Sequence, residues 1–285
     1  MGTPFITLLE PHGLAGYNRL ALPIPTMQPP SVPKTFLDAM TVRRQVFVEE
    51  QHVAMENEFD ADDRRSCHWV AYASVNRTIE PEVRDPTTGD IVRPRRSETS
   101  TVPVGTVRLV PFPHPPHPTP GASYLDGKLV SGGGGGDGAP AVGATVGAGE
   151  RRTSLAPKFP VDRETELHDG VEPYVKLGRL AVVKEFRGYK IGRLLVRTAL
   201  TWARKNPDYF MPSVAAVGLD QMGLGKAGSI PKWDGLVCCH AQQQVVAAWE
   251  RMGFKVDKGM GTWVEEDIPH VGMFHRVDTK AKDDD

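Results

Sequence analysis

A basic, glycine-containing turn between an apolar run and an amphipathic helix has the residue types that bind a phosphate group. The turn carries Arg187, Lys190 and Arg193, with Gly188 and Gly192 between them. The start of a helix leaves backbone N–H groups without intrahelical partners and carries a partial positive charge, so anions bind there readily. Glycine also lets the backbone approach a ligand closely. The Walker ending Gly-Lys-Ser/Thr and the dinucleotide fingerprint Gly-x-Gly-x-x-Gly are both missing, and a solvated basic turn without a ligand is the alternative interpretation.

The elements that must position this turn follow from the periodicity of the apolar residues. Helical spacing predicts helices over 34–51, 191–205 and 242–252, and apolar runs predict strands over 68–73, 102–110, 174–183 and 236–240, with two more near 262–264 and 272–274. Gly105, inside one of these strands, predicts a bulge or the close approach of another element. A strand, the basic turn and a helix therefore follow one another, and the whole pattern predicts a mixed α/β fold.

We expect a single domain over 1–285, interrupted by two long irregular insertions. The polar stretch 76–100 predicts a long hairpin loop. Residues 113–171 are rich first in proline and then in glycine, which raises the cost of ordering the chain, so we expect an inserted loop without a core. Residues 206–235 hold several glycines and form the second irregular insertion.

The bulk composition excludes several classes of protein. The chain has 285 residues with 40% apolar content, which is enough for a core, and its 34 Lys and Arg balance 35 Asp and Glu to a formal charge of −1. Such a balance gives no general attraction to nucleic acid or to anionic membranes, so we expect neither as a partner. Three cysteines without Cys-x-x-Cys spacing favour a reducing compartment, and we expect a cytoplasmic protein. No signal peptide is recognisable, and no apolar run approaches the ~20 residues of a membrane span.

The basic turn resembles the pyrophosphate-binding motif of the GCN5-related N-acetyltransferase (GNAT) superfamily, Gln/Arg-x-x-Gly-x-Gly/Ala. Arg187 and Gly192 match its outer positions, whereas Lys190 stands where the middle glycine is usual. Residues 240–254 and 265–270 resemble the C-terminal half of the superfamily, and residues 43–51 resemble the Arg-x-x-Val-Phe-x-x-Glu-Gln segment of its small-amine members. The resemblance covers 34–276 outside the two insertions. It implies the GNAT fold, a mixed central sheet flanked by helices.

The resemblance also implies acetyl-CoA as co-substrate, a primary amine of a small molecule as acceptor, and no metal. By analogy, the backbone of Leu180, Ala181 and Val182 would bind the pantetheine as an added strand. The residues expected to hold the pyrophosphate are Arg187, Gly188, Tyr189, Lys190, Ile191, Gly192 and Arg193.

An amine must lose a proton before it attacks the thioester, so a general base is expected. The candidates are Glu50 and Glu49, which end the first predicted helix, and His240 at a strand end; a solvated acidic helix end and a buried structural histidine are the alternatives. Residues expected to bind the acceptor are Asp60, Asp63, Gln242 and Trp249. The superfamily usually has a tyrosine that protonates the thiolate where this chain has Trp249, and an indole N–H does not titrate usefully. The source of that proton is left open.

Several alternatives remain open at this point. The acidic helix end favours a small cationic acceptor such as an amino sugar (glucosamine), a polyamine or an arylamine. A protein N-acetyltransferase and a catalytically silent CoA-binding module are the alternatives, and a homodimer is compatible with either. A zinc site on Cys238, Cys239 and His240 with Cys67 and His68 is disfavoured, because adjacent strand residues point to opposite faces. A Cys–His nucleophilic pair is disfavoured against ordinary cysteine packing.

Overall fold

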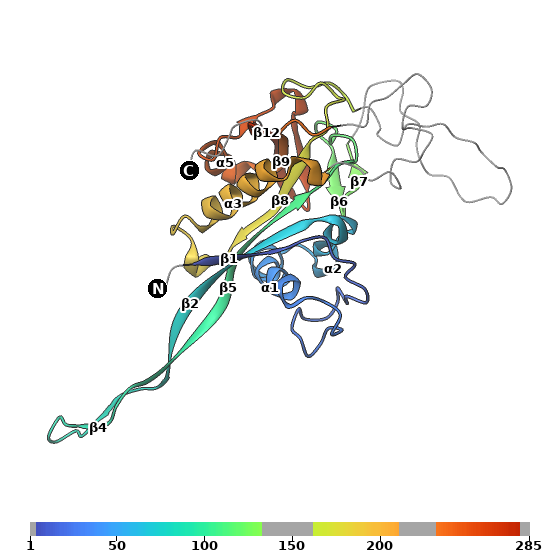
Figure 1. The fold of residues 1–285 in the computed structure, drawn as a ribbon. Coiled ribbons are helices and arrows are strands. Elements are labelled where there is room, and N and C mark those ends of the chain that lie inside the picture. The colour runs from blue at the N-terminus through green and yellow to red at the C-terminus, as the bar shows by residue number, and fades with distance from the viewer. Residues whose placement is uncertain (1–3, 133–161, 211–231, 280–285) are drawn as a thin grey trace. The chain divides into compact units, whose positions relative to one another are not determined.

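The computed structural model describes residues 4–132, 162–210 and 232–279 (Figure 1). These residues belong to two compact units. The first unit comprises Met1–Pro111, Val175–Pro207 and Val277–Asp285, and the second comprises Phe112–Tyr174 and Asp208–Arg276. The single domain over 1–285 stays a prediction. Among the described residues, no helix has the length and apolar character needed to cross a membrane.

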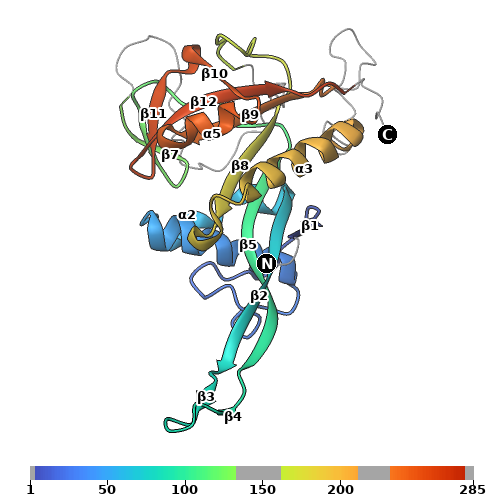
Figure 2. The same cartoon turned by 90° about the vertical axis from the view of Figure 1, so that its left-hand side faces the viewer.

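The first unit is built on an antiparallel sheet in the order β1, β2, β5, β8. These strands are Phe5–Leu9, Cys67–Glu80, Arg96–Val110 and Val175–Val182. Strands β2 and β5 stay paired far beyond their buried ends and carry the small hairpin of β3 (Val83–Arg84) and β4 (Ile91–Arg93) at their tip (Figures 1 and 2). The prediction of a loop over 76–100 is therefore wrong, because strands cover most of this range. Both faces of this ribbon are exposed, so its strands lack the apolar alternation from which strands are predicted.

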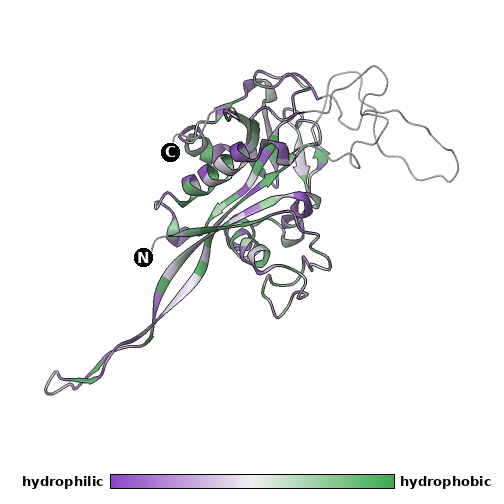
Figure 3. Ribbon diagram, viewed as in Figure 1, coloured by the Kyte–Doolittle hydropathy of each residue, from purple (hydrophilic) through white to green (hydrophobic). Residues whose placement is uncertain are grey.

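Helices cover both faces of this sheet. Helix α1 (Lys34–Arg43) continues as the π-helical segment Arg44–Glu50, and α3 spans Ile191–Lys205; a single helical turn, α2, spans Met55–Glu58. His68 and Trp69 are successive residues of β2, whose side chains point to opposite faces, and their rings lie 5.3 Å from Phe36 of α1 and 5.6 Å from Trp202 of α3. The ribbon of α3 alternates between apolar and polar residues, as one buried face requires (Figure 3).

The close approach predicted at Gly105 is confirmed. A Cβ atom at this position would lie 3.0 Å from Leu195 Cδ1 and 3.1 Å from Ile191 Cγ2, both on α3. Gly105 pairs with Ala71 of β2, and the register between β2 and β5 shifts directly after this pair, between Ala71 and Tyr72. Glycine thus lets α3 lie directly on the sheet.

The sheet strands of the second unit follow one another in the order β9, β12, β11, β6, β7, with β10 also paired to β12. The strands are Leu236–Gln242, Ile268–Arg276, Thr262–Glu265, Ser123–Leu125, Lys128–Ser131 and Lys255–Val256. All pairs are antiparallel except β6 with β11. The helix predicted over 242–252 is shorter, a 3₁₀ turn followed by α5 (Val246–Glu250). The predicted mixed α/β class is confirmed, with a mostly antiparallel sheet and few helices.

Both predicted insertions contribute packed residues to the second unit. Strands β6 and β7 lie within 113–171, and His117, Ala122 and His168 are buried, so the prediction that this segment has no core is wrong at both of its ends. Ring stacking and backbone hydrogen bonds order these ends, and neither shows in apolar content. In the segment 206–235, buried Trp233 contacts Phe210 with ring centroids 5.0 Å apart. The remainders, 133–161 and 211–231, lie outside the described residues.

Candidate functional site

The predicted phosphate-binding turn joins β8 to α3 in the first unit. After one 3₁₀ turn, Lys184–Phe186, the backbone takes the left-handed conformation at Gly188 (φ 86°) and again at Lys190 (φ 62°), which caps α3. Among the described residues, no side chain forms a capping hydrogen bond at this helix start. The backbone N–H groups of the first turn of α3 are therefore suited to donate hydrogen bonds to an external anion.

The side chains of the turn are arranged as a ligand site requires. Arg187, Tyr189, Lys190 and Arg193 are exposed, whereas Ile191 is buried and anchors the helix start. A Cβ atom at Gly188 would meet nothing within 4 Å, so its left-handed φ, rather than crowding, requires glycine here. The geometry is compatible with the predicted pyrophosphate site, which stays a prediction.

The turn contacts the acidic end of the first helix. Arg187 donates from Nε to the carbonyl of Val182 at 2.9 Å and from Nη2 to Glu50 Oε2 at 2.6 Å. Glu49 pairs with Arg44 at 2.7 Å. The two predicted acidic bases are therefore both in ion pairs, and Glu50 partly neutralises the arginine expected to bind the pyrophosphate.

Strand β8 bulges just before the segment predicted to bind pantetheine. Thr106 pairs with Ala181 but Arg108 pairs with Gly178, so β8 holds one extra residue, and Arg179 has φ 50°. Bulges redirect a strand and are common beside active sites. Leu180 and Val182 are half-buried, and Ala181 is buried.

A buried ionic network corrects the prediction for Asp63. This carboxylate is fully buried and accepts from Arg43 Nη1 at 2.6 Å and Arg108 Nη1 at 2.8 Å. Burial alone would raise the pKa of Asp63, but the two guanidinium groups outweigh it and hold the pKa well below its usual range. Asp63 therefore stabilises the fold and does not reach an acceptor.

Asp60 lies at the edge of the same network. Its carboxylate accepts from Arg108 Nη1 at 2.6 Å and from Arg179 Nη2 at 3.1 Å, and it caps the 3₁₀ turn Ala61–Arg65. Burial opposes ionisation, yet Arg108 and Arg179 together lower the pKa of Asp60. An acceptor role for Asp60 stays a prediction, with two arginines already on its carboxylate.

In the second unit, His240 is oriented by a carboxylate that the sequence analysis did not identify. His240 Nδ1 lies 2.8 Å from Glu265 Oε1, which also accepts from Trp263 Nε1 at 2.7 Å. Because a carboxylate only accepts, His240 carries its proton on Nδ1 and its basic lone pair on Nε2. Gln242, two residues further along β9, lies on the same face of the strand as His240. This arrangement is typical of a general base held in one tautomer.

Trp249 is a core residue of the second unit. Its side chain is buried, and its ring centroid lies 4.9 Å from that of Phe254. The prediction that Trp249 lines an acceptor site is corrected, because its side chain packs into the core beneath α5.

The cysteines do not show the chemistry of the open alternatives. Cys67, Cys238 and Cys239 are buried thiols that are not joined in disulfides. His68 donates from Nε2 to the carbonyl of Asp63 at 2.9 Å, and burial lowers its pKa to about 4. These observations favour ordinary packing of all three cysteines.

Comparisons with known proteins find similarity only at the level of solved structures. No protein-family model matches the chain, and no curated protein matches it in sequence. An acyl-CoA N-acyltransferase from Pseudomonas aeruginosa aligns with a TM-score of 0.42 and 17% identity over 96% of this chain and 99% of its own. Escherichia coli ElaA aligns with a TM-score of 0.40 and 14% identity, covering 95% of this chain and 100% of its own. AtaTR bound with acetyl-CoA aligns with a TM-score of 0.33 and 13% identity, covering 97% of this chain and 95% of its own. At these TM-scores and identities the likeness establishes no activity for this chain.

Proposed function

We propose that the protein is an acetyl-CoA-dependent N-acetyltransferase that acetylates the primary amine of a small molecule. The observation that carries this proposal is the basic start of α3, where Arg187, Lys190 and Arg193 surround a helix N-terminus without a side-chain cap among the described residues. A diphosphate carries the charge and the acceptor oxygens that such a site binds.

The strand that leads into the turn supports the same donor. The bulge at Arg179 redirects β8 immediately before Leu180, and the strand then runs to Val182, whose carbonyl accepts from Arg187. A pantetheine arm that followed this backbone would reach the phosphate site at the end of the strand.

His240 is the residue we assign as general base. The amine attacks the thioester carbonyl, a C–N bond forms, the C–S bond breaks, and the proton from the amine passes to His240 Nε2 directly or through water. Glu265 holds the opposite nitrogen at 2.8 Å and stabilises the imidazolium that results. The CoA thiolate leaves and takes its proton from solvent.

The acceptor class is proposed as a small cationic amine, such as an amino sugar, a polyamine or an arylamine. Glu49 and Glu50 lie beside the donor turn and favour a positively charged acceptor. A protein N-acetyltransferase and a silent CoA-binding module are distinguished from this proposal by experiment.

The test is a panel of amines with acetyl-CoA, in which released thiol and the mass of the product are both followed. Glucosamine, spermidine, an arylamine and a peptide with a free N-terminus cover the acceptor classes. His240→Gln should lower kcat by roughly 10²- to 10⁴-fold and leave acetyl-CoA affinity unchanged. His275→Gln, which removes another imidazole from the same unit, should have little effect. Glu265→Gln should shift the pH profile of kcat, as expected of a residue that positions His240.

Three outcomes would contradict the proposal. If acetyl-CoA does not bind, its assignment as the acetyl donor is wrong. Binding without turnover of any amine indicates a silent module, and turnover of the peptide alone indicates a protein acetyltransferase.

A further inference from the structure

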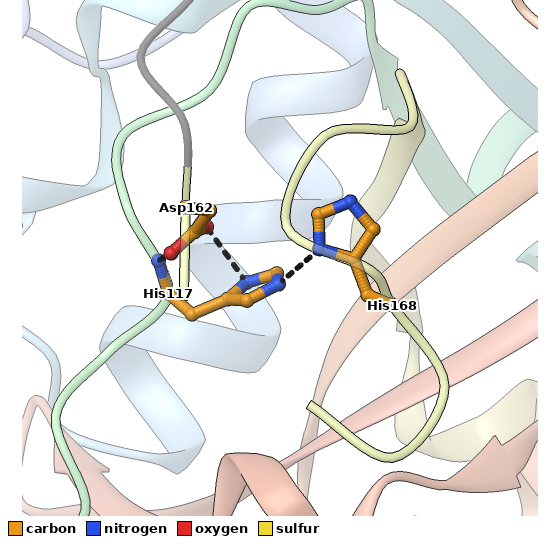
Figure 4. A group of neighbouring side chains, drawn as sticks. All are labelled: His117, Asp162 and His168. Carbon is orange, nitrogen blue, oxygen red and sulfur yellow. Dashed lines mark hydrogen bonds and ion pairs between the residues drawn. The ribbon is translucent and has the colours of Figure 1, made fainter. Parts of the chain in front are cut away.

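A second group of titratable side chains lies in the second unit and has no part in the proposed reaction. His117, Asp162 and His168 point toward one another (Figure 4). His117 Nε2 lies 2.9 Å from His168 Nδ1, and His117 Nδ1 lies 3.4 Å from Asp162 Oδ2. The ligand atoms that the three residues offer all lie within 4.8 Å of one another.

The hydrogen bonds of this group determine which nitrogen atoms carry protons. His168 Nε2 lies 2.9 Å from the carbonyl of Glu172, so it must donate, and the Nδ1 of neutral His168 must accept. His117 Nε2 therefore donates to His168 Nδ1. In neutral His117 the lone pair then lies on Nδ1, where it faces the carboxylate of Asp162. Two acceptors that face each other require a cation between them.

Burial makes this requirement stronger. The side chain of His117 is 0% exposed, and its Nδ1 forms no hydrogen bond within the part of the chain that the structure describes. A buried acceptor without a partner is costly.

The surroundings of these side chains are those of metal ligands. Asp162 is held by the backbone N–H of His117, at 3.0 and 2.8 Å from its two oxygens, and by that of Arg163 at 2.8 Å. His168 donates its other ring N–H to the carbonyl of Glu172. Metal-bound histidines almost always donate that second N–H to a carbonyl or carboxylate, which orients the ring.

A cavity adjoins the group. It has a volume of about 70 Å³, and its lining includes Asp162 and His168 together with Tyr174. One water requires roughly 10–15 Å³ of such volume, so the cavity has room for water ligands.

We propose that His117, Asp162 and His168 bind a divalent transition-metal ion, and that Zn²⁺ is the ion that fits best. Zinc bonds to imidazole nitrogen and carboxylate oxygen at about 2.0–2.2 Å, which places neighbouring ligand atoms of a tetrahedron about 3.3 Å apart. The His117 Nδ1 to Asp162 Oδ2 distance of 3.4 Å matches this spacing. His168 Nδ1 exchanges its hydrogen bond to His117 for the metal, and water from the cavity completes the coordination.

Such an ion would tie together parts of the chain that are far apart in sequence. His117 and Asp162 are 45 residues apart and flank the segment 133–161. Because these ligands come together only in the folded chain, metal binding stabilises the fold of the second unit. The site is structural and is independent of the donor turn.

The test uses the full chain after removal of metal with a chelator. Titration calorimetry and metal analysis should find one Zn²⁺ per chain, and the melting temperature should rise with zinc concentration. Asp162→Asn and His168→Gln should each weaken zinc binding by at least about tenfold. Asp162→Asn keeps an oxygen that can accept from the backbone. His275→Gln serves as the control and should bind zinc like the unaltered protein.

Three results would overturn the proposal. They are an unaltered protein that neither binds zinc nor shifts its melting temperature, variants that bind as tightly as the control, and a cobalt titration without tetrahedral absorption bands. The cobalt spectrum is measured on the unaltered protein, so it decides the matter even where a variant fails to fold. Bands that saturate at one equivalent support the site.

Discussion

The donor turn offers the most direct quantitative test of the proposed function. Arg187→Ala combined with Lys190→Ala removes two positive charges from the start of α3. Because Lys190 already has a Cβ atom at φ 62°, alanine adds no new backbone strain there. At Lys190 the substitution therefore changes the charge without changing the backbone strain.

The magnitude follows from the exposure of the two side chains. A hydrogen bond between charged groups contributes about 1.5–3 kcal/mol when it is well shielded. The Arg187 side chain is 46% exposed and already pairs with Glu50, so solvent screening and the competing carboxylate place the contribution at the lower end. Loss of both side chains should cost about 2–4 kcal/mol, which is roughly a 30- to 1,000-fold rise in the Kd of acetyl-CoA.

Titration calorimetry with acetyl-CoA at low and high salt measures this effect. The matched control is Arg204→Ala with Lys205→Ala, which removes two basic residues from the opposite end of the same helix. The affinity of the unaltered protein should fall with salt, and the turn variant should lose most of that dependence. A Kd within about threefold of the unaltered protein would refute the assignment of the turn, given that threefold is well under 1 kcal/mol.

Glu50→Gln separates two roles of this carboxylate. Its oxygen lies 2.6 Å from Arg187 Nη2, so removal of its charge should release the guanidinium and tighten acetyl-CoA binding severalfold. A large loss of kcat with unchanged donor affinity would instead identify Glu50 as the base.

Two further predictions concern the buried charges of the first unit. Asp63→Asn leaves Arg43 and Arg108 without their shared counter-charge, so it should lower the free energy of unfolding by about 3–5 kcal/mol in urea titrations. The control Asp62→Asn changes a half-exposed ion pair and should lower it by under about 1 kcal/mol. Equal losses in the two variants would contradict the buried network. Burial lowers the pKa of His68 from 6.5 to about 4, so the unfolded chain binds a proton that the folded chain excludes, and stability is full above pH 6.5 and falls as the pH drops toward 4. Between about pH 7 and 5, the His68→Gln variant should lose about 2 kcal/mol less of its free energy of unfolding than the unaltered protein loses. An equal loss in both proteins would show that His68 does not titrate this way.

Features determined by a short stretch of sequence could be predicted. The basic turn, the helix that follows it and the close approach at Gly105 depend on neighbouring residues and on strict periodicity. Amphipathic spacing also locates the central strands. These features need no knowledge of what lies across the fold.

Roles that depend on distant partners could not be predicted. Asp63 looked like an acidic ligand for an amine, but Arg108, 45 residues further along the chain, and Arg43 enclose it. The orientation of His240 depends on Glu265, which reaches it only because β9, β12 and β11 are neighbours.

Composition concealed the histidine group of the second unit. His117 and His168 lie inside 113–171, whose proline and glycine content indicated an unpacked loop. The signal that could have been used is the presence of two histidines and an aspartate at the ends of the insertion, close to the strands that it joins. Metal ligands compensate for a lack of apolar residues, so a segment poor in them can still be ordered.

The charges of the first unit explain how a chain of formal charge −1 can present a cationic site. The carboxylates of the buried network form ion pairs with Arg43, Arg108 and Arg179, and Glu50 forms an ion pair with Arg187. Lys190 and Arg193 form no ion pair with any residue that the structure describes. Positive charge therefore remains uncompensated at the start of α3, where the helix dipole adds to it. A polyanion is attracted to this end of one helix by local charge, whereas the charge of the whole chain would give it no preference.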